Sequence, residues 1–133
     1  MEHICKICFE DPTSHSFSQV DSIDNIPVFY TCPSIATKYF DKIGILEHYE
    51  NTLNQHGSKP WIWIFDGKDF ELKHALEIST GIEIAKMITN KFSDNLRKIY
   101  IINANWYIHT FYNVVHPFLS QKVRDLIVII DSN

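Results

Sequence analysis

The sequence has few glycines and no long apolar run, and each shortage excludes a class of protein. Its 133 residues include only four glycines, at positions 44, 57, 67 and 81. Their spacing fits neither a glycine-rich dinucleotide turn nor a Walker loop, so nucleotide binding by those routes is excluded. The longest unbroken apolar runs, Trp61 to Phe65 and Leu126 to Ile130, have five residues each. A membrane-spanning helix needs about 20.

Basic residues are also scarce, with 12 Lys and Arg against 16 Asp and Glu, a formal charge of -4. They are spread along the chain, whereas nucleic-acid binding needs clustered Lys and Arg. We therefore expect no nucleic-acid partner. The N-terminal residues carry acids early and lack a long apolar core, so they do not look like a secretory signal. We expect a soluble, cytoplasmic protein.

Cysteine is limited to Cys5, Cys8 and Cys32, an odd number in a chain too large to need a disulfide framework. A CxxC pair with a nearby imidazole has the reach of a tetrahedral zinc site. Cys5 and Cys8 with His3 form such a group, and Cys32 and His15 are the nearby residues that could complete it.

A second interpretation of this N-terminal pair is structural. No other close cysteine pair exists, and Ile4, Lys6 and Cys8 alternate as in an edge strand. A thioredoxin-like redox role would need a helix directly after the pair, but Asp11 and Pro12 follow. We favour the edge strand, and we predict no metal and no cofactor.

Apolar patterns predict an alternation of strands and helices. Buried strands are predicted at 28–30, 61–65, 99–102 and 126–130, and helices at 35–53, 72–92 and 106–118. Ser34 is the expected N-cap of the first helix, Gly57 its end, and residues 11–24 a loop. The order predicts one α/β domain over residues 1–133, with a mostly parallel sheet floor and crossover helices. Residues 1–20 form an N-terminal arm and loop, and residues 21–130 form the core.

Five segments resemble motifs of the CRAL-TRIO lipid-binding domains. The run Ile101 to Trp106 is similar to the family's "IINAPW", with Asn105 in place of the proline, and His116 to Leu119 is similar to "KPFL". Phe92 to Lys98 looks like "YPERLKK", Phe65 to Lys68 like "DLEG", and Asp24 to Val28 like "D..G.PV". The resemblance covers roughly residues 20 to 130.

The resemblance implies non-covalent binding of a lipid or other small hydrophobic molecule between sheet and helices. A phosphoinositide, another phospholipid or an isoprenoid-like molecule would fit, with a transient membrane surface as a further partner. A buried aromatic stripe is more often core than pocket, so these residues are candidates only. The candidate pocket residues are Trp61, Trp63, Phe65, Tyr100, Ile102, Trp106, His109, Thr110, Phe111, Val115 and Phe118.

The family normally continues after its last strand with a gate helix and an "LP..GG" segment. The sequence has no counterpart of these, so we expect a minimal version of the domain with an exposed apolar face. The N-terminal arm, a second copy of the chain, a membrane surface or a bound lipid would each cover it. A protein-interaction scaffold or homodimer is therefore the alternative function.

Catalysis has little support in the sequence. Asp66 ends a strand, as the nucleophile of an aspartyl phosphotransferase does. However, Lys68 stands where a second Asp is needed, and Asp69 falls one residue too late. We expect Asp66 and Gly67 to form a turn that caps the next helix, and we predict no enzyme activity.

Overall fold

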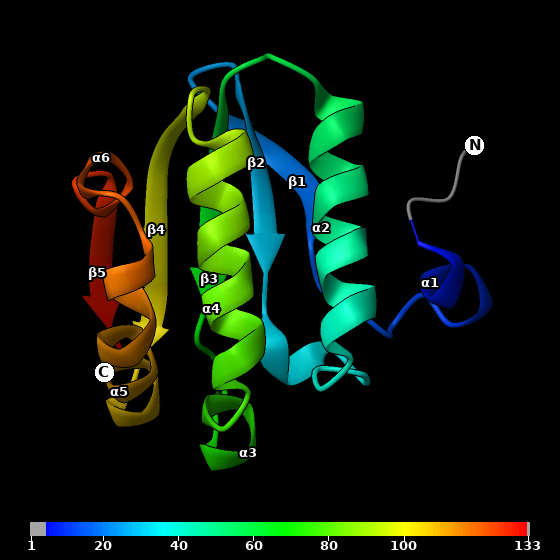
Figure 1. Ribbon diagram of the computed structural model, residues 1–133, viewed down its shortest axis with the longest axis vertical. Helices are drawn as coiled ribbons and strands as arrows, with labels where there is room; N and C mark the ends of the chain where they lie inside the picture. Colours follow the sequence, from blue (N-terminus) through cyan, green and yellow to red (C-terminus); the bar gives the residue numbers. More distant parts are fainter. Residues whose placement is uncertain (1–4, 133) are drawn as a thin grey trace.

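The structure, a computed structural model, describes residues 5–132 and contains one five-stranded sheet. The strands lie in the order of the sequence, as Figure 1 shows. The first pair is antiparallel and the other three pairs are parallel, so the predicted α/β class with a mostly parallel sheet is confirmed. The strands are β1 (Ser18–Ile23), β2 (Ile26–Thr31), β3 (Trp61–Asp66), β4 (Leu96–Ala104) and β5 (Ile127–Asp131).

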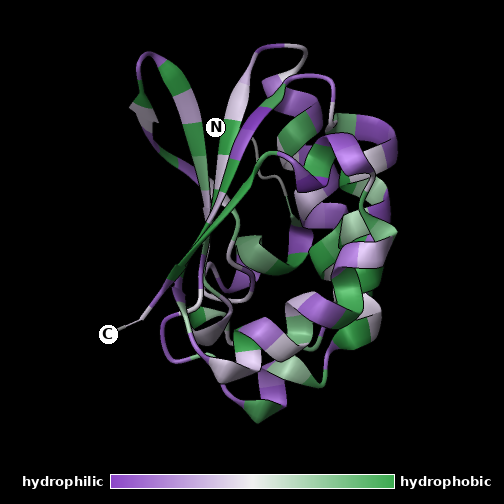
Figure 2. Ribbon diagram, turned by 90° about the vertical axis from the view of Figure 1, so that its left-hand side faces the viewer, coloured by the Kyte–Doolittle hydropathy of each residue, from purple (hydrophilic) through white to green (hydrophobic). Residues whose placement is uncertain are grey.

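The helices gather on one side of this sheet, as Figure 2 shows. Each parallel pair needs a crossover, and right-handed crossovers between strands in sequential order place their helices on one face. The helical elements are α1 (Lys6–Glu10), η1 (Pro33–Ile35), α2 (Lys42–His56), α3 (Leu72–Ala75), α4 (Ile78–Met87), the π-helical η2 (Ile88–Phe92), α5 (Trp106–Val115), η3 (His116–Phe118) and α6 (Gln121–Arg124).

An aromatic cluster fills the space between the sheet and α2. Phe17, from the segment before β1, stacks on Tyr49 of α2 with ring centroids 4.0 Å apart. It also stacks on Phe29 of β2 and meets Trp61 and Trp63 of β3 edge to face. All five rings are buried. Phe17, which lies within the predicted N-terminal arm, is thus part of the core.

Two predictions for the N-terminal region are wrong. Residues 11–24 are not all loop, because β1 pairs with β2 as a hairpin. Every residue of β1 is exposed, so the strand has no apolar alternation that the sequence could reveal. The edge strand predicted around Cys8 is instead the short helix α1. His3, which was part of the zinc interpretation, and Ile4, which was part of the edge-strand interpretation, lie outside the described residues.

The first long helix begins later than predicted. The residues around Ser34 form only the short 3-10 helix η1. The helix α2 starts after Asp41, which is its N-cap. The Asp41 carboxylate accepts a hydrogen bond from the backbone N–H of Gly44. Gly57 ends the helix with a positive φ of 78°, as predicted. The predicted helix 72–92 is divided into α3, α4 and the π-helical turn η2. Asn103, expected to end its strand, lies within β4 with a φ of 53°.

The β1–β2 turn leads to a first testable prediction. Asp24 and Asn25 both have positive φ, 51° and 67°, as the central residues of a type I′ turn require. Glycine adopts such angles without strain, so Asn25→Gly is expected to raise the free energy of unfolding by about 0.5 kcal/mol. Urea denaturation measures this. Ser22→Gly within β1 is the control and is expected to be destabilising, because glycine weakens strands.

Candidate ligand pocket

A cavity of about 150 Å³ lies between the helical face of the sheet and the helices above it. Its floor comes from three parallel strands and includes Trp63, Phe65, Ile99, Ile101 and Ile127. Its roof comes from α4 and α5 and includes Ile84, Ala85, Phe111, Tyr112 and Val115. These walls are almost entirely hydrocarbon and aromatic ring, which suits an apolar ligand.

Four of the predicted pocket residues line this cavity: Trp63, Phe65, Phe111 and Val115. Trp61 is instead 2% exposed in the aromatic core, where its Nε1 donates to the carbonyl oxygen of Phe92. Tyr100 and Ile102 alternate with the lining residues Ile99 and Ile101, so they lie on the opposite face of β4.

The other predicted residues lie on the outer surface of α5 and η3. Trp106 is 72% exposed and Phe118 is 40% exposed. His109 Nε2 contacts the Asp131 carboxylate at 2.6 Å, and the Thr110 hydroxyl donates to the carbonyl oxygen of Trp106. His109 and Thr110 therefore do not line the cavity.

Three polar side chains in the wall hydrogen-bond to one another. Trp63 Nε1 donates to Oγ1 of Thr31 at 3.1 Å, and that oxygen is 3.0 Å from the Tyr49 hydroxyl. Burial raises the pKa of Tyr49, so this phenol stays neutral. The network leaves the apolar surfaces of these side chains to face the cavity.

Apolar side chains surround one end of the cavity. Tyr39 and His74 line that end and contact each other with ring centroids 4.8 Å apart. Burial lowers the pKa of His74, which favours the neutral imidazole there. The side chains beside this pair on the same two segments are exposed and apolar, and we call them the apolar rim: Phe40, Ile43, Leu72 and Leu76. The rim could not be predicted from the sequence, because Ile43 and Leu72 belong to helical patterns that suggest burial.

Asp66 acts as a clamp between strands. Its carboxylate accepts hydrogen bonds from the Tyr30 hydroxyl of β2, Asn103 Nδ2 of β4 and the backbone N–H of Lys68. Burial opposes its ionisation, but these three donors outweigh burial and hold the pKa of Asp66 below its ordinary value. It does not cap the next helix as predicted, because α3 is capped by Glu71 and His74.

Sheet, crossover helices and an apolar cavity between them make up this α/β domain. A sequence model of the CRAL/TRIO domain matches residues 40–133, which is more than half of the chain. The protein belongs to the CRAL/TRIO domain family. Domains of this family generally bind lipids and carry out no covalent chemistry.

Relatives and solved structures agree with this assignment. Clavesin-2 of human and of rat are each 29% identical to the chain over 75 residues, or 55% of this chain and 23% of theirs. Clavesin-1 of Xenopus laevis is 28% identical over 75 residues. The crystal structure of Sfh5 superimposes with a TM-score of 0.72 at 12% identity, covering 91% of this chain and 48% of that one. The chain thus matches about a quarter of the clavesins and half of Sfh5.

Within residues 5–132, no helix has both the length and the apolar character that crossing a bilayer requires.

Proposed function

We propose that the chain binds a lipid or a similar hydrophobic molecule, without covalent chemistry, in the cavity between the sheet and α4 and α5. The observation that supports this most is the nature of the walls. Among the lining residues of the described chain, Glu77 is the one acidic side chain, and Trp63, Thr31 and Tyr49 hydrogen-bond to one another. A ligand of hydrocarbon character therefore does not leave these three groups without a hydrogen-bond partner.

The size of the cavity constrains how a lipid would fit. About 150 Å³ is comparable to a protein cavity that takes up benzene. Pockets that hold drug-sized molecules have roughly 300–1,000 Å³. A whole acyl chain therefore needs side chains of the roof, such as Phe111 and Tyr112, to rotate outward. We expect binding to be accompanied by a movement of α5 relative to α4.

The apolar rim supports exchange of the ligand with a membrane. Phe40, Ile43, Leu72 and Leu76 are between 55% and 79% exposed and lie beside the end of the cavity that Tyr39 and His74 line. Lys42 and Lys73 on the same segments are accompanied by Asp41 and Glu71, and the Lys73 ammonium lies 3.9 Å from the Glu71 carboxylate. Exposed apolar side chains among charges of both signs suit the interface of a bilayer. We propose that the rim contacts the bilayer while the lipid enters.

Native mass spectrometry of the freshly purified protein, with lipid extraction from the same sample, tests the proposal. We expect a lipid adduct on the wild-type chain. Ala85→Trp places an indole in the cavity and is expected to reduce the occupancy at least about tenfold, because each excluded methylene forfeits about 0.8 kcal/mol of burial. Asn90→Trp, at an exposed position outside the cavity, is the matched control and should keep the adduct.

Circular dichroism must show that Ala85→Trp is folded, since overpacking costs about 1–3 kcal/mol. If it is not, Val115→Phe fills the same cavity from α5. An adduct that both filled variants retain would contradict binding at this position. A wild-type chain that carries no lipid and takes up none from phospholipid vesicles would contradict the function itself.

The face of the sheet opposite the helices favours a second candidate function. Tyr100 and Ile102 lie on this face and are half-buried, while Ile130 at its edge is 50% exposed. No described helix covers the face (Figure 2). An apolar face of this kind suits a protein partner or a second copy of the chain. Sedimentation at increasing concentration separates the two functions, because a lipid-free dimer would favour the scaffold.

A further inference from the structure

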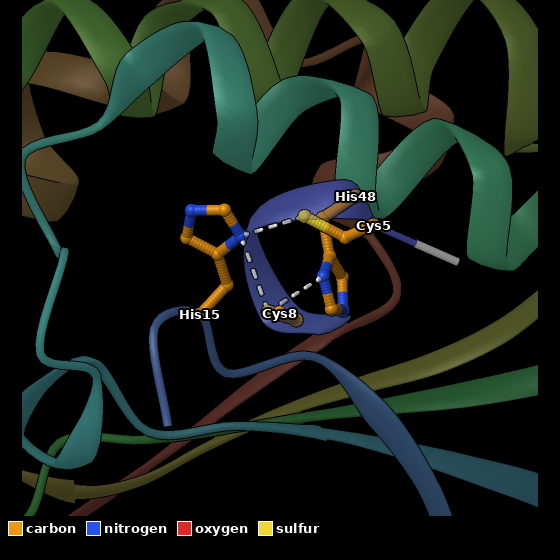
Figure 3. A group of neighbouring side chains, drawn as sticks. All are labelled: Cys5, Cys8, His15 and His48. Carbon is orange, nitrogen blue, oxygen red and sulfur yellow. Dashed lines mark hydrogen bonds between the residues drawn. The ribbon is translucent and has the colours of Figure 1, made fainter. Parts of the chain in front are cut away.

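Four side chains of metal-ligating types meet between α1, the loop before β1 and α2. Cys5 and Cys8 come from the start of α1, His15 from the loop before β1, and His48 from the middle of α2. Figure 3 shows the four side chains pointing toward one another. Their sulfur and nitrogen atoms all lie within 4.8 Å of each other. The zinc interpretation of the sequence included Cys5, Cys8 and His15 together with His3 and Cys32, but not His48.

The distances fit a shared metal ion. His15 Nδ1 is 3.4 Å from Cys5 Sγ and 3.5 Å from Cys8 Sγ, and His48 Nδ1 is 3.6 Å from Cys8 Sγ. Sulfur at about 2.3 Å and nitrogen at about 2.1 Å from a tetrahedral zinc ion lie about 3.6 Å apart. Separate thiol–imidazole hydrogen bonds would join each sulfur to one nitrogen. Here His15 Nδ1 lies near the sulfurs of both cysteines, and Cys8 Sγ lies near the Nδ1 atoms of both histidines.

The outer nitrogens of both histidines are held by acceptors. His48 Nε2 is 2.8 Å from the carbonyl oxygen of Phe17, which can only accept, so Nε2 carries the hydrogen. His15 Nε2 is 2.9 Å from the Asp41 carboxylate. In a neutral imidazole this leaves the lone pair on Nδ1, which faces the cluster. Metal-binding histidines typically show this arrangement, with the second ring N–H bound to a carboxylate or carbonyl.

The surroundings are shaped to hold Asp41 against His15. A Cβ added to Gly44 would lie 2.0 Å from Asp41 Oδ2 and 2.9 Å from His15 Cε1, so only glycine allows this approach. Cys5 and His15 are buried, with exposed fractions of 4% and 6%, and His48 is 9% exposed. These contacts fix the ligands in place before any ion binds.

The cluster also explains how α1 is held. No residue of this five-residue helix is buried, and Figure 1 shows it beside α2, away from the sheet. A helix this short gains little stability from packing when none of its residues is buried. A metal ion that joins its first turn to His15 and His48 would fasten it to α2.

From these observations we infer that Cys5, Cys8, His15 and His48 form a tetrahedral Zn²⁺ site. Two thiolates and two imidazoles are a ligand set that zinc takes in structural sites, and four protein ligands leave no open position for chemistry. The ion would fasten the N-terminal segment to α2. His15 also lines the ligand cavity, so the ion would stiffen one wall of it. The inference does not depend on the proposed lipid binding.

Metal analysis of the freshly purified, reduced chain tests the inference. We expect about one zinc ion per chain in the wild type and less than about a tenth of that in Cys8→Ser. Cys32→Ser is the matched control, because Cys32 is buried elsewhere against Ser34, and it should keep its zinc. Asp41→Asn preserves the helix cap but removes the carboxylate beside His15, and is expected to weaken zinc binding by about 10–100-fold.

Cobalt substitution keeps the test decisive if Cys8→Ser does not fold. Co²⁺ added to the reduced, metal-free wild type should produce the visible absorption of a tetrahedral site with thiolate ligands. Zinc added to the same sample should remove that absorption and raise Tm by at least about 5 °C. A chain that binds neither ion, that holds a Cys5–Cys8 disulfide in place of zinc, or that loses its zinc in Cys32→Ser would overturn the inference.

Discussion

Phe17→Ala is expected to lower the free energy of unfolding by about 3–5 kcal/mol, as large-to-small changes of fully buried aromatic residues do. Phe17 is 2% exposed and contacts the rings of Tyr49, Phe29, Trp61 and Trp63. Its removal leaves a hole at the centre of the aromatic cluster, which rigid strands on one side and α2 on the other cannot close. The loss is a large share of the stability of an ordinary domain.

Urea denaturation followed by tryptophan fluorescence measures this loss. Val20→Ala is the control from the same N-terminal segment, because Val20 is 56% exposed on β1 and should change stability by less than about 0.5 kcal/mol. Equal effects of the two variants would show that the segment before β1 is not packed as the structure describes.

Asp66→Asn is expected to lower the free energy of unfolding at pH 7 by about 2–3 kcal/mol. Hydrogen bonds to a charged group contribute about 1.5–3 kcal/mol each, and the amide cannot accept from Tyr30, Asn103 and Lys68 as the carboxylate does. The structure therefore assigns Asp66 a role in joining β2, β3 and β4 at their carboxyl ends. Asp94→Asn is the control, since that side chain is 96% exposed.

The pH dependence distinguishes this clamp from simple loss of packing. The pKa of Asp66 is lower in the folded chain than in the unfolded one. Its contribution is therefore complete above the unfolded value of about 3.9 and is lost as pH falls through the folded value. The difference in stability between the wild type and Asp66→Asn should shrink below about pH 4. A difference that stays constant down to pH 2 would contradict the clamp.

The fold was predictable where burial leaves a clear pattern. The runs Trp61 to Phe65 and Ile99 to Ile102 are apolar at every position, which is typical of parallel strands, and both lie in the parallel part of the sheet. The same uniformity hid which face of β4 meets the cavity, because Tyr100 and Ile102 are as apolar as Ile99 and Ile101. β1 could not be predicted, since its residues are all exposed and its place depends on pairing with β2.

The four-residue cluster was only partly visible in the sequence. The spacing of Cys5 and Cys8 indicates that both could bind one metal ion. His48, however, is 40 positions from Cys8 and lies within a helix whose sequence pattern does not indicate a metal site. Only the docking of α2 beside the N-terminal segment brings them together. The π-helical turn η2 likewise has no local signal in Ile88 to Phe92.

The sequential strand order has a consequence for synthesis on the ribosome. Each strand after β1 pairs with the strand that precedes it in the chain. The strand synthesised most recently is therefore the edge strand to which the next one adds. None of the five described strands has to be inserted between two others already paired. The sheet can therefore be assembled in the order of translation, with each crossover helix closing over its own strand pair before the next pair forms. Among the described strands, β5 is then the last to emerge and the last to join the sheet.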